Sequence, residues 1–178
     1  WGADPSFVAV AGGSAGGHLA ALMGLTENDE EYQPGFEFAN TSVEASVPIY
    51  GVYDMTNRFG VQSDQYVPLL MEPLVMKAFL EEEPEKFRKA SPLDRVHPDI
   101  PPFLVIQGDC DTLAPVQEAR AFVDRLEKAS ESRVVYMEFP GAQHIFDLFY
   151  SYQSARMVEG VLAFLNDMYG MSHSSPEQ

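Results

Sequence analysis

Short apolar runs alternate with stretches of helical periodicity along most of the chain. The apolar runs predict strands at residues 6–12, 43–52, 103–106 and 134–139. Apolar residues spaced three and four apart predict helices at about 14–24, 115–129 and 151–169. Strands that alternate with helices favour an α/β fold with a mainly parallel sheet and flanking helices.

Pro48 lies inside the second apolar run. Proline has no N–H to donate to a neighbouring strand, so it is rare in the middle of a sheet. We therefore expect a bulge at Pro48 or a strand that begins there.

Residues 54–95 have a different character from the flanking runs. Leucines, methionines and aromatic residues follow helical spacing there, and three prolines divide them into short helices. An amphipathic, methionine-rich insertion suits an adaptable lid over an apolar pocket; ordinary core helices are the alternative. We expect residues 1–53 and 96–170 to form the core domain, 54–95 to form a helical cap, and 171–178 to be a polar tail.

Composition excludes several classes of function. The net charge of −16 argues against nucleic-acid partners and against anionic membrane surfaces. A single cysteine, Cys110, allows neither an internal disulfide nor a cysteine-based metal cluster. No membrane-spanning segment or signal peptide is visible, so the cytoplasm is the default expectation. The chain begins at Trp1 without an initiator methionine, which suggests a piece of a longer protein.

The stretch Gly12-Gly13-Ser14-Ala15-Gly16 joins the first predicted strand to the first predicted helix. It fits G-x-S-x-G, in which a serine on a sharp strand-to-helix turn acts as a nucleophile. The glycines let the chains pass closely, and the Ala15 amide at the helix N-terminus can stabilise an oxyanion. The same short pattern also occurs by chance, and glycine-rich turns of this type also bind phosphates.

A serine hydroxyl needs an adjacent base to act as a nucleophile at neutral pH. Of the four histidines, His173 lies in the tail and His97 in a proline-rich loop, while His18 is expected to point away from the Ser14 hydroxyl. His144 follows the last predicted strand, at the carboxyl edge of the sheet where open α/β folds keep their sites. We therefore predict that His144 is the base.

Two loops offer a carboxylate to orient this base. Asp109 and Asp111 follow the third predicted strand, and Asp54 follows the second. The order Ser…Asp…His holds for each of them and is that of the α/β-hydrolase scaffold. The residues alone leave the choice open.

Three motifs together resemble hormone-sensitive-lipase-like esterases of the α/β-hydrolase superfamily, most of all the actinobacterial lipase/esterase branch. They are Gly12-Gly13-Ser14-Ala15-Gly16-Gly17-His18-Leu19, Gly108-x-x-Asp111-x-Leu113-x-Pro115 and Pro140-Gly141-Ala142-Gln143-His144-x-Phe146. The resemblance covers roughly residues 1–170. It implies that Asp111 is the triad acid and Asp109 a turn residue. It further implies hydrolysis of carboxylic esters with short to medium acyl chains, without a metal or organic cofactor.

The chain departs from this family in two respects. The family's HGGG-type loop, which adds oxyanion-hole amides, is missing, and so are the strands that precede the nucleophile. The chain therefore resembles the carboxyl-terminal part of the fold. We expect the free edge of the strand at residues 7–11 to be covered by the missing N-terminal half, by a second chain or by a copy of itself.

Three functions remain open at this stage. A carboxylesterase acting on a small-molecule ester through Ser14, Asp111 and His144 is the first. An amidase of the arylformamidase type would use the same triad. A catalytically silent fragment that serves as a binding or assembly partner is the third, and the missing oxyanion loop favours it for this chain alone.

Overall fold

The computed structural model describes residues 2–173 and contains four strands. They are β1 (Ala9–Gly13), β2 (Ala45–Ile49), β3 (Phe103–Gly108) and β4 (Val134–Phe139). All pair in parallel, in the order β1-β2-β3-β4. Four α-helices accompany them: α1 (Ala15–Leu25), α2 (Pro84–Ala90), α3 (Val116–Ala129) and α4 (Tyr152–His173). The predicted α/β fold with a parallel sheet is confirmed.

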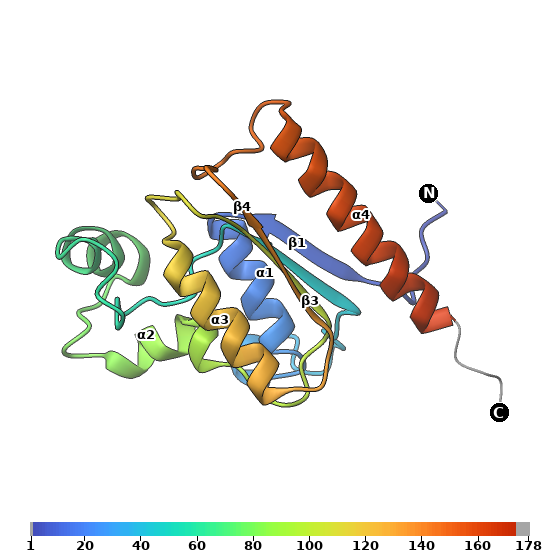
Figure 1. Cartoon of the computed structure of the whole chain (residues 1–178). Helices are drawn as coiled ribbons and strands as arrows, with labels where there is room; N and C mark the ends of the chain where they lie inside the picture. Colours follow the sequence, from blue (N-terminus) through green and yellow to red (C-terminus); the bar gives the residue numbers. More distant parts are fainter. Residues whose placement is uncertain (1, 174–178) are drawn as a thin grey trace.

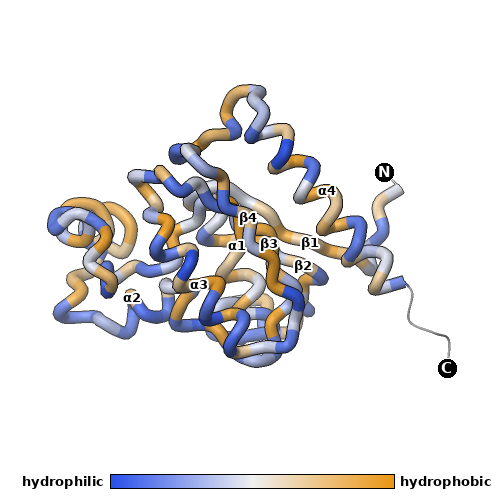
Figure 2. The backbone as a smooth tube through the Cα atoms, viewed as in Figure 1, coloured by the Kyte–Doolittle hydropathy of each residue, from blue (hydrophilic) through white to orange (hydrophobic). Residues whose placement is uncertain are grey.

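The helices enclose the sheet in three layers. Helices α1 and α3 lie on one face and α4 on the other (Figure 1). Buried side chains of β3 alternate between the two faces: Phe103 and Val105 pack with α1 and α3, whereas Leu104 and Ile106 pack with α4. This double burial explains the continuous apolar run of β3, which is orange in Figure 2.

The prediction of a bulge or a strand start at Pro48 is wrong. Strand β2 begins at Ala45 and runs through Pro48, which pairs with Gly12 of β1. Two residues to either side, the amides of Ser46 and Tyr50 donate to carbonyls of Pro102 and Ile106 on the β3 side. Pro48 therefore removes one bond from the β2–β3 ladder, and the pairing register is unchanged beyond it.

The connection between β2 and β3 holds the remaining helical segments. They are the π-helix η2 (Val67–Met76), helix α2 and the 3₁₀ turn η3 (Pro92–Asp94); a further 3₁₀ turn, η1 (Glu30–Tyr32), precedes β2. Met55, Met71 and Phe87 form a small core of their own in this connection. Segment η2, drawn in green, lies to one side of the sheet in Figure 1.

Helix α4 extends further than its sequence pattern predicts. It continues to His173, so residues 171–173 of the expected tail are helical, and 174–178 lie outside the described residues. Across residues 2–173, the helices are either too short or too polar to cross a bilayer.

Candidate active site

Three loops at the carboxyl edge of the sheet bring Ser14, His144 and Asp111 together. Nε2 of His144 lies 2.8 Å from the Ser14 Oγ, and its Nδ1 lies 2.7 Å from Oδ2 of Asp111. A carboxylate only accepts, so Nδ1 carries the proton and Nε2 is free to accept from the serine hydroxyl. The three side chains thus form one hydrogen-bonded chain that ends at a hydroxyl.

Ser14 is held in strained backbone between β1 and α1. Its φ of 57° falls in the left-handed region that non-glycine residues seldom adopt. Its amide donates to the Ile49 carbonyl (3.0 Å), which ties the turn to β2. The hydroxyl makes no capping bond to α1, although Ser14 occupies the N-cap position. It is therefore left for His144.

The glycines around Ser14 are not equally constrained. A Cβ on Gly12 would overlap the backbone of Gly16, and a Cβ on Gly17 would lie 2.6 Å from the Ile49 carbonyl oxygen. A Cβ on Gly16 would meet open space. The close approach inferred from the motif thus requires a glycine at Gly12 and Gly17, whereas Gly16 contributes only its backbone.

The Asp111 carboxylate is fully engaged and buried. Oδ1 accepts from the amides of Leu113 and Ala114 (2.9 and 2.8 Å), and Oδ2 accepts from Gln107 Nε2 (3.1 Å) as well as from His144. Bonds from four donors fix its orientation toward His144. Gln107, buried in β3, also donates to the Ala114 carbonyl (2.7 Å).

Asp109 has a different position from Asp111. Its Oδ1 accepts from the Gly141 amide, and the neighbouring Cys110 amide donates to the Ala142 carbonyl. These bonds tie the Asp111 loop to the His144 loop. Asp109 is therefore a turn residue in this structure, and it holds the two loops at a fixed separation.

Asp54 is occupied elsewhere. Its buried carboxylate accepts from the amide and hydroxyl of Thr56 and from the amide and Nε of Arg58. Glu118 of α3 is buried nearby, and burial, with the charge of Asp54, raises the pKa of Glu118 to about 7. These two carboxylates form a separate buried pair behind the site.

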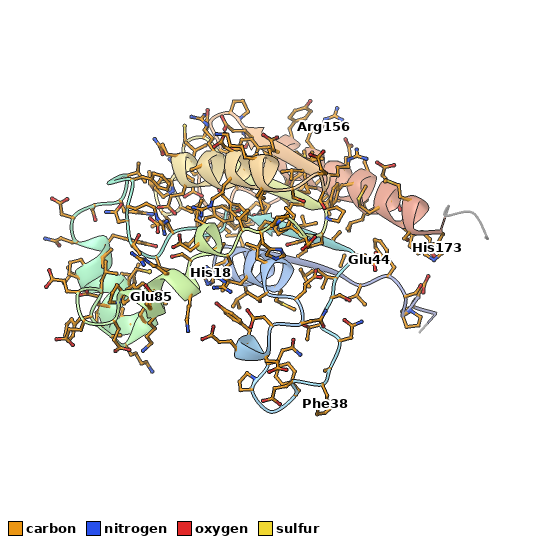
Figure 3. The ribbon with its side chains drawn as sticks, turned by 90° about the horizontal axis from the view of Figure 1, so that it is seen from below. His18, Phe38, Glu44, Glu85, Arg156 and His173 are labelled. Atoms are coloured by element: carbon orange, nitrogen blue, oxygen red, sulfur yellow. The ribbon has the colours of Figure 1, made fainter. Side chains whose placement is uncertain are left out.

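The expectation that His18 points away from the serine side is wrong. His18 lines the same cavity as Ser14 and His144, and its Nδ1 donates to the Val52 carbonyl (2.9 Å). Burial lowers the pKa of His18, so the ring is neutral. His173 instead bonds Asp4, and Figure 3 shows it at the right-hand end of the molecule, whereas His18 lies near the middle.

A cavity of about 670 Å³ opens directly onto Ser14. Uncharged side chains from α1, from residues 52–75 and from the Asp111 loop surround it, Met55, Met71 and Leu113 among them. Its size and apolar lining suit a small organic ligand. Within residues 2–173, no three His, Cys, Asp or Glu side chains converge as a metal site requires.

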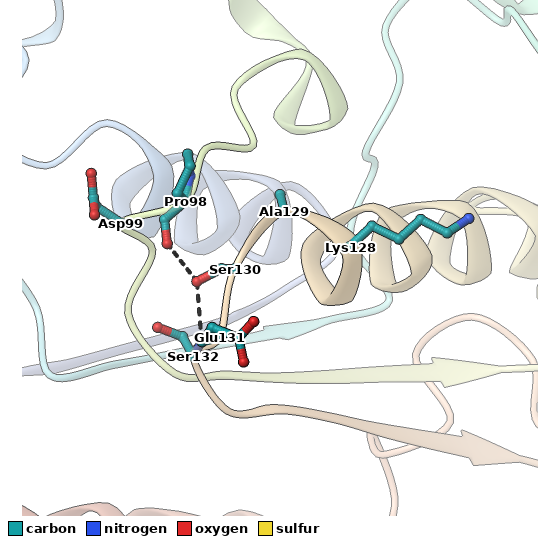
Figure 4. Close-up of a pocket in the computed structure, with 7 residues that line it drawn as sticks. All are labelled: Pro98, Asp99, Lys128, Ala129, Ser130, Glu131 and Ser132. Atoms are coloured by element: carbon teal, nitrogen blue, oxygen red, sulfur yellow. Dashed lines mark hydrogen bonds between the residues drawn. The ribbon is translucent and has the colours of Figure 1, made fainter.

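A second cavity, of about 440 Å³, lies at the opposite edge of the sheet. Residues 98–99 and 128–132 line it, next to the amino ends of β3 and β4 (Figure 4). There the Ser130 hydroxyl donates to the Pro98 carbonyl and accepts from the Ser132 amide. None of Ser14, His144 and Asp111 lines this second cavity.

The geometry of the site agrees with what comparison with known proteins shows. A sequence model of the BD-FAE family matches residues 1–126. The chain belongs to the BD-FAE family. It is 45% identical to the probable carboxylic ester hydrolase LipM and 46% identical to the esterase LipC, both from Mycobacterium tuberculosis, over 99% and 95% of this chain. It spans only 41% and 42% of the length of these curated relatives.

Solved structures place this BD-FAE chain in the α/β-hydrolase fold. A sarin-phosphonylated esterase 2 from Thermogutta terrifontis matches 99% of the chain with a TM-score of 0.72 at 22% identity, and the chain covers 61% of it. A truncated carbohydrate esterase from gut microbiota matches 93% with a TM-score of 0.70 at 22% identity, and the chain covers 60% of it. The resemblance to actinobacterial lipases and esterases of this fold is confirmed.

Several groups that shape the site carry no sequence motif. Gln107 lies inside an apolar strand, and Tyr50 and Asp147 are 97 residues apart in the chain yet share a hydrogen bond beside His144. For Gln107, the sequence offered one indication: a glutamine within an otherwise apolar strand, whose buried amide needs hydrogen-bond partners.

Proposed function

We propose that the protein is a serine hydrolase that cleaves carboxylic esters of short to medium acyl chains. Ser14 is the nucleophile, His144 the general base and Asp111 the residue that orients and stabilises the imidazolium. The observation that carries this proposal is the hydrogen-bonded chain from Asp111 through His144 to Ser14, with the Ser14 end open to an apolar cavity. The ester-hydrolase names of the mycobacterial relatives support the reaction class.

The reaction proceeds through an acyl-enzyme. His144 takes the proton of Ser14 as Oγ attacks the ester carbonyl, and the tetrahedral intermediate collapses when the alcohol leaves with that proton. Water then enters, His144 takes its proton, and the second collapse frees the acid and regenerates the Ser14 hydroxyl. Asp111 remains ionised throughout and stabilises the imidazolium of each step.

The Ala15 amide supplies one donor for the oxyanion. It is the first N–H of α1, a position without a partner inside the helix and next to the positive end of the helix dipole. Further donors come from outside residues 2–173, from the segment that completes the sheet. Removal of one oxyanion donor costs about 10²–10³ in kcat, so this segment matters for the rate.

Residues 54–95 act as the cap over the bound acyl group. Val61, Leu70 and Val75 from this segment line the cavity above Ser14. The lining contains no Asp, Glu, Lys or Arg side chain, and the chain has a net charge of −16. An uncharged ester is therefore the fitting substrate class.

The free edge of β1 is the docking site for a completing segment. Strand β1 pairs only with β2 among the described residues, and Val8, just before it, is about half exposed. The unpaired N–H and C=O groups along such an edge can pair with a further strand. The occupant is the N-terminal half, a second chain or a copy of the same strand.

A series of p-nitrophenyl esters from acetate to laurate tests the proposed function, with Ser14→Ala as the control. We expect hydrolysis that is fastest for acetate to octanoate and absent in the variant. Faster cleavage of formyl-anilides would identify an amidase with the same triad. No turnover of either class by the folded protein with its completing segment would leave a binding role.

A further inference from the structure

Tyr50 lies between the loop that carries Ser14 and the loop that carries His144. Its hydroxyl would be 2.7 Å from a Cβ on Gly13, so the ring packs directly against the residue before Ser14. On its other side, the ring meets His144 edge-on, with 4.9 Å between centroids and 62° between planes. Tyr50 is 6% exposed and touches both reacting loops.

The Tyr50 hydroxyl also holds the backbone of the His144 loop through Asp147. It donates to Oδ1 of Asp147 at 2.6 Å, a short charge-assisted bond. Burial first, and then this bond, raise the pKa of Tyr50, so the phenol keeps its proton and remains a donor. Asp147 follows His144 by three residues, and the bond therefore closes a ring of contacts around the imidazole.

The backbone is strained at Tyr50 and at Ile145, the residue that follows His144. This strain indicates that the surrounding contacts hold both positions in place. Tyr50 has a φ of 38° and Ile145 a φ of 58°, both in the left-handed region. Such conformations persist only where neighbouring contacts hold them. The Tyr50 amide donates to the Ile106 carbonyl (2.7 Å), which fixes the tyrosine to β3.

The Asp109 and Cys110 bonds hold the His144 loop at residues 141–142, and the part of the loop that follows His144 has fewer restraints. In that part Leu148, Phe149 and Tyr150 are mostly exposed, and Phe146 turns inward, against Tyr50 and Phe139. Asp111 fixes the imidazole at one nitrogen, which leaves the ring free to tilt about that bond. A second restraint is needed to keep Nε2 in line with Ser14.

We propose that Tyr50 and Asp147 are positioning residues that hold the His144 imidazole against Ser14. The inference rests on the proposed function, because it gives the pair a role in the transfer of the Ser14 proton. Tyr50 provides the surface on which the ring rests, and the bond to Asp147 keeps the loop pressed against that surface.

Four variants of the full-length protein test this proposal: Tyr50→Phe, Asp147→Ala, Asp147→Asn and the double variant Tyr50→Phe/Asp147→Ala. We expect kcat on p-nitrophenyl butyrate to fall roughly tenfold in Tyr50→Phe and Asp147→Ala, with KM within twofold, since even a 1 Å misplacement costs up to about 10². Asp147→Asn keeps an accepting oxygen and should retain most activity. The double variant should be no slower than the slower single variant, because the bond is lost only once.

Tyr136→Phe is the matched control. Tyr136 of β4 donates to Glu138 at 2.8 Å and packs against the core on the α1 and α3 face of the sheet. Rates are divided by the folded fraction from thermal unfolding. Falls in kcat no larger than that of Tyr136→Phe, or falls that disappear after this correction, would overturn the proposal.

A readout independent of turnover separates this inference from the proposed function. The proton between His144 Nδ1 and Asp111 gives a low-field NMR resonance when the ring is fixed. We expect that signal in the wild type and in Asp147→Asn, and its loss by exchange in Asp147→Ala. If the wild type shows the signal but cleaves no ester, loss of the signal in Asp147→Ala would support the positioning role and refute the hydrolase. If Asp147→Ala keeps both the signal and the kcat of the wild type, the positioning role alone is refuted.

Discussion

Nε2 of His144 lies 2.8 Å from Oγ of Ser14, although 130 residues separate them in the chain. Their meeting depends on the parallel sheet, which puts the carboxyl ends of β1 and β4 at one edge. It depends also on the bonds from Asp109 and Cys110 that tie the intervening loops together.

Asp111 and Asp109 should differ sharply in their effect on catalysis. Asp111→Asn keeps the shape of the acid but offers the wrong hydrogen-bonding pattern to His144, and we expect kcat to fall by about 10³–10⁴. Asp109→Asn leaves the oxygen that accepts from Gly141, so kcat should change by less than about tenfold. Steady-state kinetics on one ester measures both. Equal losses in the two variants would contradict the assignment of the acid.

The two outer glycines of the serine motif should respond in opposite ways to alanine. Gly12→Ala forces a methyl group against the Gly16 backbone, and we expect a loss of about 1–3 kcal/mol in the free energy of unfolding. Gly16→Ala points its methyl into open space within α1, where alanine is the better helix former by about 0.5–1 kcal/mol. Urea unfolding measures both. A stabilised Gly12→Ala variant would refute the close approach at the turn.

Glu118 should make stability fall as the pH rises. Its pKa is raised to about 7 from 4.5 in the folded chain, first by burial and then by Asp54. The folded state therefore binds more protons at Glu118 than the unfolded state does between these values. The stability that this proton contributes is fully present below about pH 4.5 and is lost as the pH rises to about 7.

The variant Glu118→Gln isolates this effect. It lacks the titrating proton, and the stability of the wild type relative to this variant should drop by up to about 3 kcal/mol between pH 5 and pH 8. Urea unfolding at the two pH values provides the comparison. Parallel pH profiles for the two proteins would show that Glu118 does not hold a proton in the folded state.

Hydrogen exchange tests whether the β1 edge is covered. The amides of residues 7–11 should be protected in the full-length or assembled protein, because a further strand or chain pairs with them. Strand β3, paired on both sides, serves as the protected control, and β4, the other edge of the described sheet, as the open one. Rapid exchange at residues 7–11 in a stable monomer would refute the covered edge.

The elements of this fold could be predicted from sequence because their patterns are local. The run at 134–139 matches β4 at both ends, and the helix expected at 115–129 differs from α3 by one residue. Pro48 misled the prediction because the missing N–H weakens one ladder bond without shifting the register. The packing of β2 on both sides outweighs that loss.

The candidate site was predictable only as far as its motifs. Ser14, Asp111 and His144 each follow a strand, and the topology of a parallel sheet brings such positions to one edge. The side chain of His18 could not be oriented from its position four residues after Ser14, because its direction depends on a bond to Val52 in a distant loop.

Tyr50 was missed for the same reason. It reads as the end of an apolar run, and nothing local indicates that its hydroxyl meets Asp147, 97 residues later. Contacts of this kind follow from tertiary structure, and a single sequence gives no signal for them.

The most direct test of the account is labelling of the full-length protein with a fluorophosphonate, followed by mass spectrometry of the intact chain and of its peptides. Ser14 can attack phosphorus only when His144 removes its proton, so we predict stoichiometric labelling at Ser14, none in Ser14→Ala and slow labelling in His144→Ala. Absence of labelling in folded wild-type protein, or labelling at another serine, would contradict the claim that Ser14 is an activated nucleophile.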